Sequence, residues 1–302
     1  MEQVLLVLWP LFALIAMGFI LRRVSLFAAD FWPSAEKLNY FILFPALLIN
    51  SLASAPLDNP KLPYLAAAIF FILGISSALV LVIKIFSKMP IPRFGAHIQG
   101  ITRFNTYLGL AIVADLFGTE GIAIAAVLMA ILVPSCNVIA VLSLTSGAKI
   151  SIKQLILPII KNPLIISCVI GILLNLLPIG LPFGTDQLLK LLAAASLPLG
   201  LICIGAALQT ATLRIEFKPL MISSLVRLLA MPALAIFTAK LFSLPTLESV
   251  LLVIFFAIPT APTAYILTRQ LKGDSQLMAG IITLQTVMAV ITLPVILSLM
   301  LD

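Results

Sequence analysis

Long apolar runs alternate with short polar gaps along the whole chain. The runs are continuous, and most have the length of about 20 residues that a helix needs to cross a bilayer. The gaps hold turn-forming residues, as in Asp58-Asn59-Pro60 and Gly118-Thr119-Glu120-Gly121. The pattern predicts an all-α polytopic membrane protein. Its ten predicted transmembrane helices are at about 4–21, 35–54, 62–86, 98–117, 121–145, 155–177, 187–208, 218–241, 248–269 and 275–301.

Composition strengthens this prediction. Of the 302 residues, 62% are apolar and 10% are charged, and the mean hydropathy is +1.24. A typical soluble domain has about 25% charged residues. A soluble chain of this length leaves much of its surface in water, so the bilayer must be most of the solvent here. This excludes a cytosolic enzyme, a secreted domain and a disordered chain, and continuous runs argue against an outer-membrane barrel.

The net charge of +7 comes from basic residues in the gaps between spans. Their distribution indicates which side of the membrane each gap faces. With the N-terminus outside, three basic residues face outwards, Lys61, Lys190 and Lys240, and Arg227 lies inside a span. Fourteen then face the cytoplasm: Arg22, Arg23, Lys37, Lys84, Lys88, Arg93, Arg103, Lys149, Lys153, Lys161, Arg214, Lys218, Arg269 and Lys272. This asymmetry predicts a plasma-membrane protein with both termini on the outer side.

The two halves of the chain resemble each other at a nearly constant offset. Pro10 and Gly18 recur as Pro163 and Gly171, 153 residues later. Further pairs at offsets of 153 to 156 are Lys37 with Lys190, Pro45 with Pro198, Lys84 with Lys240, and Gly118 with Gly273. Because each unit holds five spans, the second copy enters the membrane from the opposite side, as in many secondary transporters. We expect a first repeat at 1–145 and an inverted second repeat at 155–302.

Helix-breaking residues mark matching spans of the two halves. The span at 248–269 holds Pro259 and Pro262, together with the polar residues Thr260, Thr263 and Tyr265. The span at 98–117 holds three poor helix formers, which are Asn105, Thr106 and Gly109. Interrupted helices at corresponding positions point to a transport site. The alternative is a pair of kinked packing helices. Pro45 and Pro198 form a second matched pair, which we interpret as static kinks.

With these residues in order, the chain resembles the auxin efflux carrier family, which includes plant auxin exporters and bacterial dicarboxylate permeases. The resemblance covers nearly the whole chain. It rests on Leu38-Asn39-Tyr40-Phe41-Ile42-Leu43-Phe44-Pro45-Ala46-Leu47-Leu48, Asn105-Thr106 with Gly109, Asn162-Pro163-Leu164-Ile165-Ile166 with Gly171, Pro198 and Gly205, Arg227 with Met231-Pro232, Ala257-Ile258-Pro259, and Thr292-Leu293-Pro294.

The resemblance implies a scaffold of helices 1, 2, 6 and 7 (about 4–54 and 155–208) that also forms a homodimer. It implies a transport domain of helices 3–5 and 8–10 (about 62–145 and 218–301), which moves like an elevator and in which helices 4 and 9 cross. It implies that Asn105 contacts a substrate carboxylate. Phe104 stands where plant members carry proline, and the long central loop is missing. A small carboxylate in a bacterial inner membrane is therefore expected rather than auxin.

The candidate substrate-binding residues are Asn105, Thr106, Asn137, Arg227, Thr260, Thr263 and Tyr265. Arg227 is a cation deep in a span, which is costly without water or a partner. Either it compensates an anionic substrate or it is a structural cation bonded to helix-end carbonyls. Asn137 either approaches the crossing helices or joins neighbouring helices, and Gln285 and Thr286 have the same two interpretations.

The carboxylates fall at span ends or in gaps, so none is predicted at the middle of the membrane. Asp115 is the one candidate for protonation, and His97, the only histidine, is expected in a connecting loop. We expect no cofactor, metal or nucleic acid. The expected partners are a small organic anion, the lipid bilayer and a second copy of the chain. The alternatives are a sodium-coupled symporter of the bile-acid type, a membrane-embedded enzyme and a sensor, and the last two lack the residues or domains they need.

Overall fold

The computed structural model describes residues 2–53, 61–145, 160–177, 184–214 and 216–301, together with Leu157 and Leu181. Within these ranges the regular structure is helical, without a strand. The helices are α1 (Glu2–Arg23), α2 (Phe31–Leu38), the π-helix η1 (Asn39–Leu43), α3 (Phe44–Ala53), α4 (Leu62–Ser87), α5 (Ile91–Thr102), α6 (Thr106–Leu144), α8 (Pro163–Leu176), α9 (Thr185–Ala207), the 3-10 helix η2 (Thr210–Arg214), α10 (Phe217–Leu225), the π-helix η3 (Val226–Ala230), α11 (Met231–Leu241), α12 (Thr246–Ala257), α13 (Thr263–Gln270) and α14 (Ser275–Leu301).

Six of the described helical segments are long and apolar enough to cross a membrane. They are Val4–Arg23, Leu62–Ser87, Ile91–Leu144, Thr185–Ala207, Phe217–Leu241 and Ser275–Leu301, and the shorter helices α8 and α12 are also apolar. Large apolar side chains such as Trp9, Phe86 and Ile291 are exposed on the outside of the molecule. These features fit a multi-pass membrane protein, whose outer surface faces lipid. Ten spans and an inverted repeat stay predictions.

Two predicted boundaries differ from the structure. Helix α5 begins at Ile91, well before the predicted start at residue 98. Pro92 stands in its first turn, where a missing N–H is tolerated. The prediction that His97 lies in a loop is therefore wrong, because His97 is buried inside α5 at 9% exposure. The same early start puts Arg103 directly after α5, between the two helices α5 and α6, and the expectation that it faces the cytoplasm stays a prediction.

The predicted gap at Gly118-Thr119-Glu120-Gly121 is a sharp kink inside α6. Gly118 has φ +56° and ψ −144°, which is not helical. Backbone with positive φ is open to glycine and strained for most other residues. The kink divides α6 into the two segments that the sequence predicts as separate spans.

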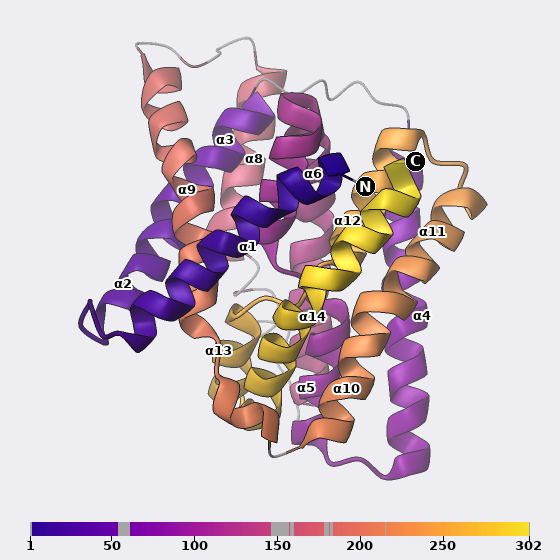
Figure 1. The fold of residues 1–302 in the computed structure, drawn as a ribbon. Helices are drawn as coiled ribbons and strands as arrows, with labels where there is room; N and C mark the ends of the chain where they lie inside the picture. Colours follow the sequence, from indigo (N-terminus) through magenta and orange to yellow (C-terminus); the bar gives the residue numbers. More distant parts are fainter. Residues whose placement is uncertain are drawn as a thin grey trace.

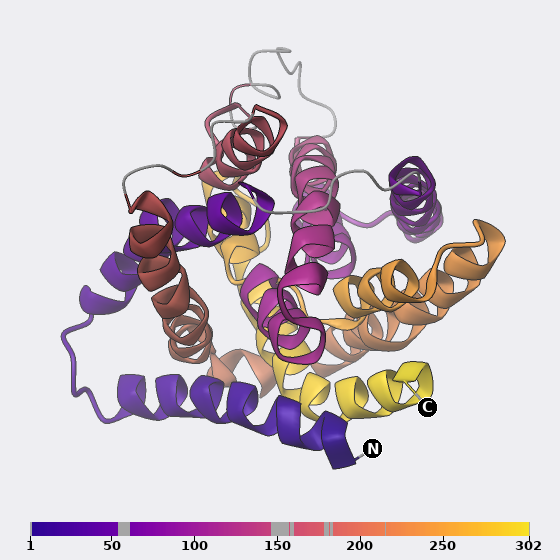
Figure 2. The ribbon, with the colours of Figure 1, turned by 90° about the horizontal axis from the view of Figure 1, so that it is seen from above.

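Helices far apart in the sequence lie side by side (Figures 1 and 2). Helix α1 packs along α9, and α3 packs against α8 and α9. A second group is formed by α4, α5 and α10–α14, and α6 contacts helices of both groups. The two chain termini lie near each other in both views. The assignment of these groups to a scaffold and a transport domain stays a prediction.

The α1–α9 contact brings two backbones together at glycines. A Cβ atom added to Gly18 would lie 1.9 Å from the carbonyl oxygen of Ile202, and one added to Gly205 would lie 1.8 Å from that of Ile15. Inside a membrane, small residues let helices approach closely and gain van der Waals contact. These glycines therefore set the distance between α1 and α9.

Gly205→Ala is predicted to push α1 and α9 apart, because the obstructing atoms belong to the backbone of α1. We expect a loss of about 1–3 kcal/mol in the free energy of unfolding, or more. The measurement is the melting temperature of the purified protein in detergent. Gly74→Ala is the matched control, since nothing lies within 4 Å of a Cβ at Gly74. Equal melting temperatures for the two variants would contradict this account of the contact.

Candidate functional site

Two helical segments are interrupted, and the interruptions touch. Residues 103–105 separate α5 from α6, and residues 258–262 separate α12 from α13. The backbone N–H of Asn105 donates to the carbonyl oxygen of Pro259 at 2.8 Å. The polar groups that each interruption frees are therefore close to those freed by the other.

The side chain of Asn105 caps the second half of the first interrupted segment. Its Oδ1 accepts from the backbone N–H of Leu108 at 3.2 Å, and the residue is 1% exposed. Asparagine is a preferred N-cap because it satisfies an N–H group that has no partner in the helix. Its Nδ2 atom is buried and has no hydrogen-bond partner among the described residues.

Most of the other predicted site residues surround the interruptions. Thr106 is the first residue of α6, Pro262 is the N-cap of α13, and Thr263 and Tyr265 are in the first turn of α13. Gly109 lies inside α6 rather than in the interruption. A Cβ there would lie 2.9 Å from Cδ1 of Ile258, so Gly109 lets the second interrupted segment approach.

Thr260 and Gln285 bind the two interruptions together. Thr260 is fully buried, and its hydroxyl donates to the carbonyl oxygen of Gln99 at 3.1 Å. Gln285 of α14 accepts from the backbone N–H of Thr260 and donates to the carbonyl oxygen of Gly100, both at 2.9 Å. One side chain thus satisfies groups of both interrupted segments. Thr286 donates only within its own helix, to the carbonyl oxygen of Ile282.

Arg227 lies in the π-helix η3 with no exposed surface. Its Nη1 donates to the carbonyl oxygen of Ile101 at 2.8 Å. Its Nε donates to that of Ile258 at 2.8 Å, and its Nη2 to that of Phe255 at 2.7 Å. This is the geometry of the structural cation bonded to helix-end carbonyls, one of the two alternatives that the sequence leaves open. A contact between Arg227 and a substrate stays a prediction.

Arg103 is a site residue that the sequence analysis missed. Its Nη2 donates to Oδ1 of Asn137 in α6, and its Nη1 is buried without a partner among the described residues. Its backbone is extended, at φ −75° and ψ 156°. Asn137 therefore approaches the first interruption, through Arg103. The Pro-Ile-Pro start of α5 is the signal that moves Arg103 into the middle of the segment.

Pro45 and Pro198 are in neither interruption, but residues beside them reach the start of α6, since the rings of Phe44 and Tyr107 lie 4.9 Å apart and a Cβ added to Gly200 would lie 2.7 Å from Cγ of Tyr107. Pro45 is in α3, next to the π-helix η1, and Pro198 is inside α9. A buried polar pair joins η1 to α9, since Asn39 Nδ2 donates to the carbonyl oxygen of Ser196 and Ser196 Oγ donates to Asn39 Oδ1, both at 3.0 Å. Kinks at Pro45 and Pro198 stay a prediction.

A cavity of about 560 Å³ adjoins the second interruption. It lies between the elements α1, α2 and α9 on one side and α13 and α14 on the other. Its polar lining includes Arg22, Glu36, Gln209, Tyr265 and Arg269, and Pro262 borders it. The cavity is large enough for a small ligand and has basic groups in its wall.

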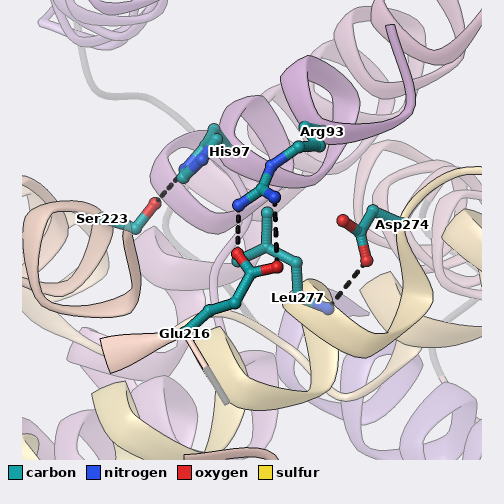
Figure 3. Close-up of polar contacts among 6 residues, drawn as sticks. All are labelled: Arg93, His97, Glu216, Ser223, Asp274 and Leu277. Atoms are coloured by element: carbon teal, nitrogen blue, oxygen red, sulfur yellow. Dashed lines mark hydrogen bonds and ion pairs between the residues drawn. The ribbon is translucent and has the colours of Figure 1, made fainter. Parts of the chain in front are cut away.

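A polar cluster fastens α5 to its neighbours (Figure 3). Arg93 pairs with both carboxylate oxygens of Glu216, one of them at 3.1 Å from Nη1. His97 Nδ1 and Ser223 Oγ are hydrogen-bonded at 2.8 Å, and Asp274 accepts from the backbone N–H of Leu277 at 3.0 Å. These contacts connect α5 with α10 and cap the start of α14.

An all-helical chain with an apolar outer surface, two interrupted helices that meet and a cavity beside them is typical of a membrane transporter. A family model described as "membrane transport protein" matches residues 3–297, and the chain belongs to this family, which is the auxin efflux carrier family. The resemblance stated from the sequence is thus confirmed. A comparison with curated proteins finds no match to this chain.

Gln285→Leu is predicted to destabilise the contact between the interruptions. It leaves the N–H of Thr260 and the carbonyl oxygen of Gly100 buried without their partner, at about 1–3 kcal/mol for each group. The check is thermal unfolding in detergent. Thr286→Val, one position along, removes only a bond within α14 and is expected to change the melting temperature little. A Gln285→Leu variant as stable as Thr286→Val would contradict the bridging role.

Proposed function

We propose that this protein is a secondary transporter that moves a small organic anion, in the first place a carboxylate, through a site at the two helix interruptions. One observation carries the proposal. Arg103 Nη1 and Asn105 Nδ2 are buried N–H donors that have no partner in the described part of the chain, and both belong to the same interruption. Buried polar groups are normally paired, so two free donors at one place call for an acceptor.

The chemistry of these two donors favours a carboxylate. Arg103 is extended and so is Asn105, at φ −83° and ψ 97°. Side chains two residues apart point to the same side of extended backbone, so the two donors can serve one ligand. An arginine and an amide offer N–H groups and a positive charge, which a carboxylate accepts in short, strong hydrogen bonds.

The helix ends add to this preference. Helix α6 begins at Thr106 and α13 begins at Thr263, so each interruption presents the N-terminus of a helix. The N-terminus carries a partial positive charge of about half an elementary unit, which favours an anion. The cavity beside Pro262 and Tyr265, with Arg22 and Arg269 in its wall, supplies a route on which anions are concentrated.

The larger arrangement belongs to the same proposal. The group of α1, α3, α8 and α9 serves as the scaffold and the dimer contact, and the group of α4, α5 and α10–α14 moves against it as an elevator in which the interrupted helices cross. The cavity between the two groups supports this division. The turn from α4 to α5 and the start of α10 lie at one end of the molecule (Figure 1). Because these segments carry Lys88, Arg93 and Lys218, we place that end in the cytoplasm and both termini outside, in a plasma membrane.

Asn105→Asp tests the site with little loss of the helix cap. The change keeps Oδ1 as the acceptor for Leu108 and replaces the free donor with a negative charge. We expect malate or malonate to raise the melting temperature of the purified wild-type protein, because a ligand that binds only the folded state stabilises it. We expect this shift to be lost in Asn105→Asp and reduced at least tenfold in apparent affinity in Arg103→Gln.

Asn162→Asp is the matched control, since Asn162 caps a different helix, α8, in the same way, with Oδ1 accepting from the backbone N–H of Leu164 at 2.9 Å. It is expected to keep the wild-type response. Undiminished stabilisation of Asn105→Asp by the dicarboxylates would place the site elsewhere. A response only to a bulky sterol-like anion with sodium would favour the bile-acid-type symporter instead.

A further inference from the structure

The carbonyl oxygens at the two interruptions accept hydrogen bonds from donors outside their own helix. In the last turn of α5, the oxygen of Gln99 accepts from Thr260, that of Gly100 from Gln285, and that of Ile101 from Arg227. The oxygen of Thr102 accepts from Sγ of Cys136 at 3.2 Å. The oxygen of Gln99 also accepts from the backbone N–H of Arg103 at 3.0 Å, and the oxygens of Gly100, Ile101 and Thr102, which lie beyond this last helical bond, each have a side-chain donor.

The second interruption repeats the arrangement at the end of α12. Arg227 takes the oxygens of Phe255 and Ile258, and Asn105 takes that of Pro259. The guanidinium therefore joins carbonyls at the C-terminal ends of two half-helices. Each such end carries about half a negative charge, so the two ends together are balanced by about one positive charge.

Carbonyls of unwound backbone and C-terminal half-helix ends are the groups with which transporters of this construction coordinate a coupling cation such as sodium. Here the guanidinium of Arg227 binds these carbonyl oxygens, and the side chain of Arg227 has no exposed surface. A sodium ion at this place would lose three of its oxygen ligands and would stand beside a like charge in a medium of low dielectric constant. The ring of Phe256, 5.9 Å from the guanidinium carbon, closes another side.

We propose that Arg227 is a built-in cation that occupies the place of a coupling ion and holds the two interrupted helices together. The inference rests on the transport function of the family and on the geometry of Arg227. It does not depend on the identity of the substrate, so an experiment can refute it without refuting the anion site at Arg103 and Asn105.

The proposal predicts that removal of the guanidinium creates a cation site. In Arg227→Ala the carbonyls of Ile101, Phe255 and Ile258 face an empty space of the size of the lost side chain. We expect a lowered melting temperature that sodium or free guanidinium at about 10 mM restores by roughly 2–4 °C or more. Choline chloride keeps the ionic strength constant, and the wild-type protein is expected to melt at the same temperature in sodium and in choline.

Leu228→Ala is the matched control, because Leu228 is the next residue and is equally buried. It is expected to melt lower through the cavity it leaves, without a response to either cation. Arg227→Gln, which keeps an amide donor, serves as the second variant if Arg227→Ala fails to fold, and the same cation response is expected of it. The comparison of sodium with choline on the wild-type protein tests the proposal even if neither variant folds.

Two results would overturn the proposal. One is stabilisation of the wild-type protein by sodium over choline, which would show that a sodium site exists beside Arg227. The other is a folded Arg227→Ala or Arg227→Gln variant that responds to neither sodium nor guanidinium, or responds no more than Leu228→Ala. A cation response confined to the Arg227 variants supports the proposal, whichever anions the protein binds.

Discussion

Interrupting two helices inside a bilayer leaves backbone N–H and C=O groups without their usual partners, and each unpaired group costs several kcal/mol where water is excluded. The rest of this structure depends on how that constraint is met. Arg227, Gln285 and Thr260 supply partners to carbonyls of both interruptions, and Asn105 caps the helix that follows the first. The π-helix η3 positions Arg227 for this role, in keeping with the frequent use of such turns at functional sites.

The C-terminal and N-terminal helix ends at the interruptions differ in the side chains beside them. The C-terminal ends of α5 and α12 meet the cation Arg227, and the buried donors of Arg103 and Asn105, which have no partner among the described residues, directly precede the N-terminus of α6. The C-terminal end at each interruption is therefore neutralised by the protein itself. In the proposed function, Arg227 keeps the shape of the site and Arg103 receives the anion.

The sequence predicted the helical class, the family and the segments at which the helices are interrupted, because prolines, amides and apolar runs carry those signals locally. It did not reveal which side chains pair across the interruptions. Arg227 and Gln285 each had two open interpretations, and only the spatial meeting of α5, α12 and α14 shows their carbonyl partners. The boundary error at α5 hid both Arg103 and His97, since a start at residue 98 ignores Pro90 and Pro92, which favour a helix start at 91.

A structure of the protein determined with bound malate or malonate would test the central claim most directly. The account predicts a carboxylate oxygen at about 2.7–3.1 Å from Arg103 Nη1 and from Asn105 Nδ2, as in charge-assisted hydrogen bonds. It also predicts that Arg227 keeps its three carbonyl partners in that complex. A carboxylate bound to Arg227 in place of those carbonyls, or bound away from both interruptions, would contradict it.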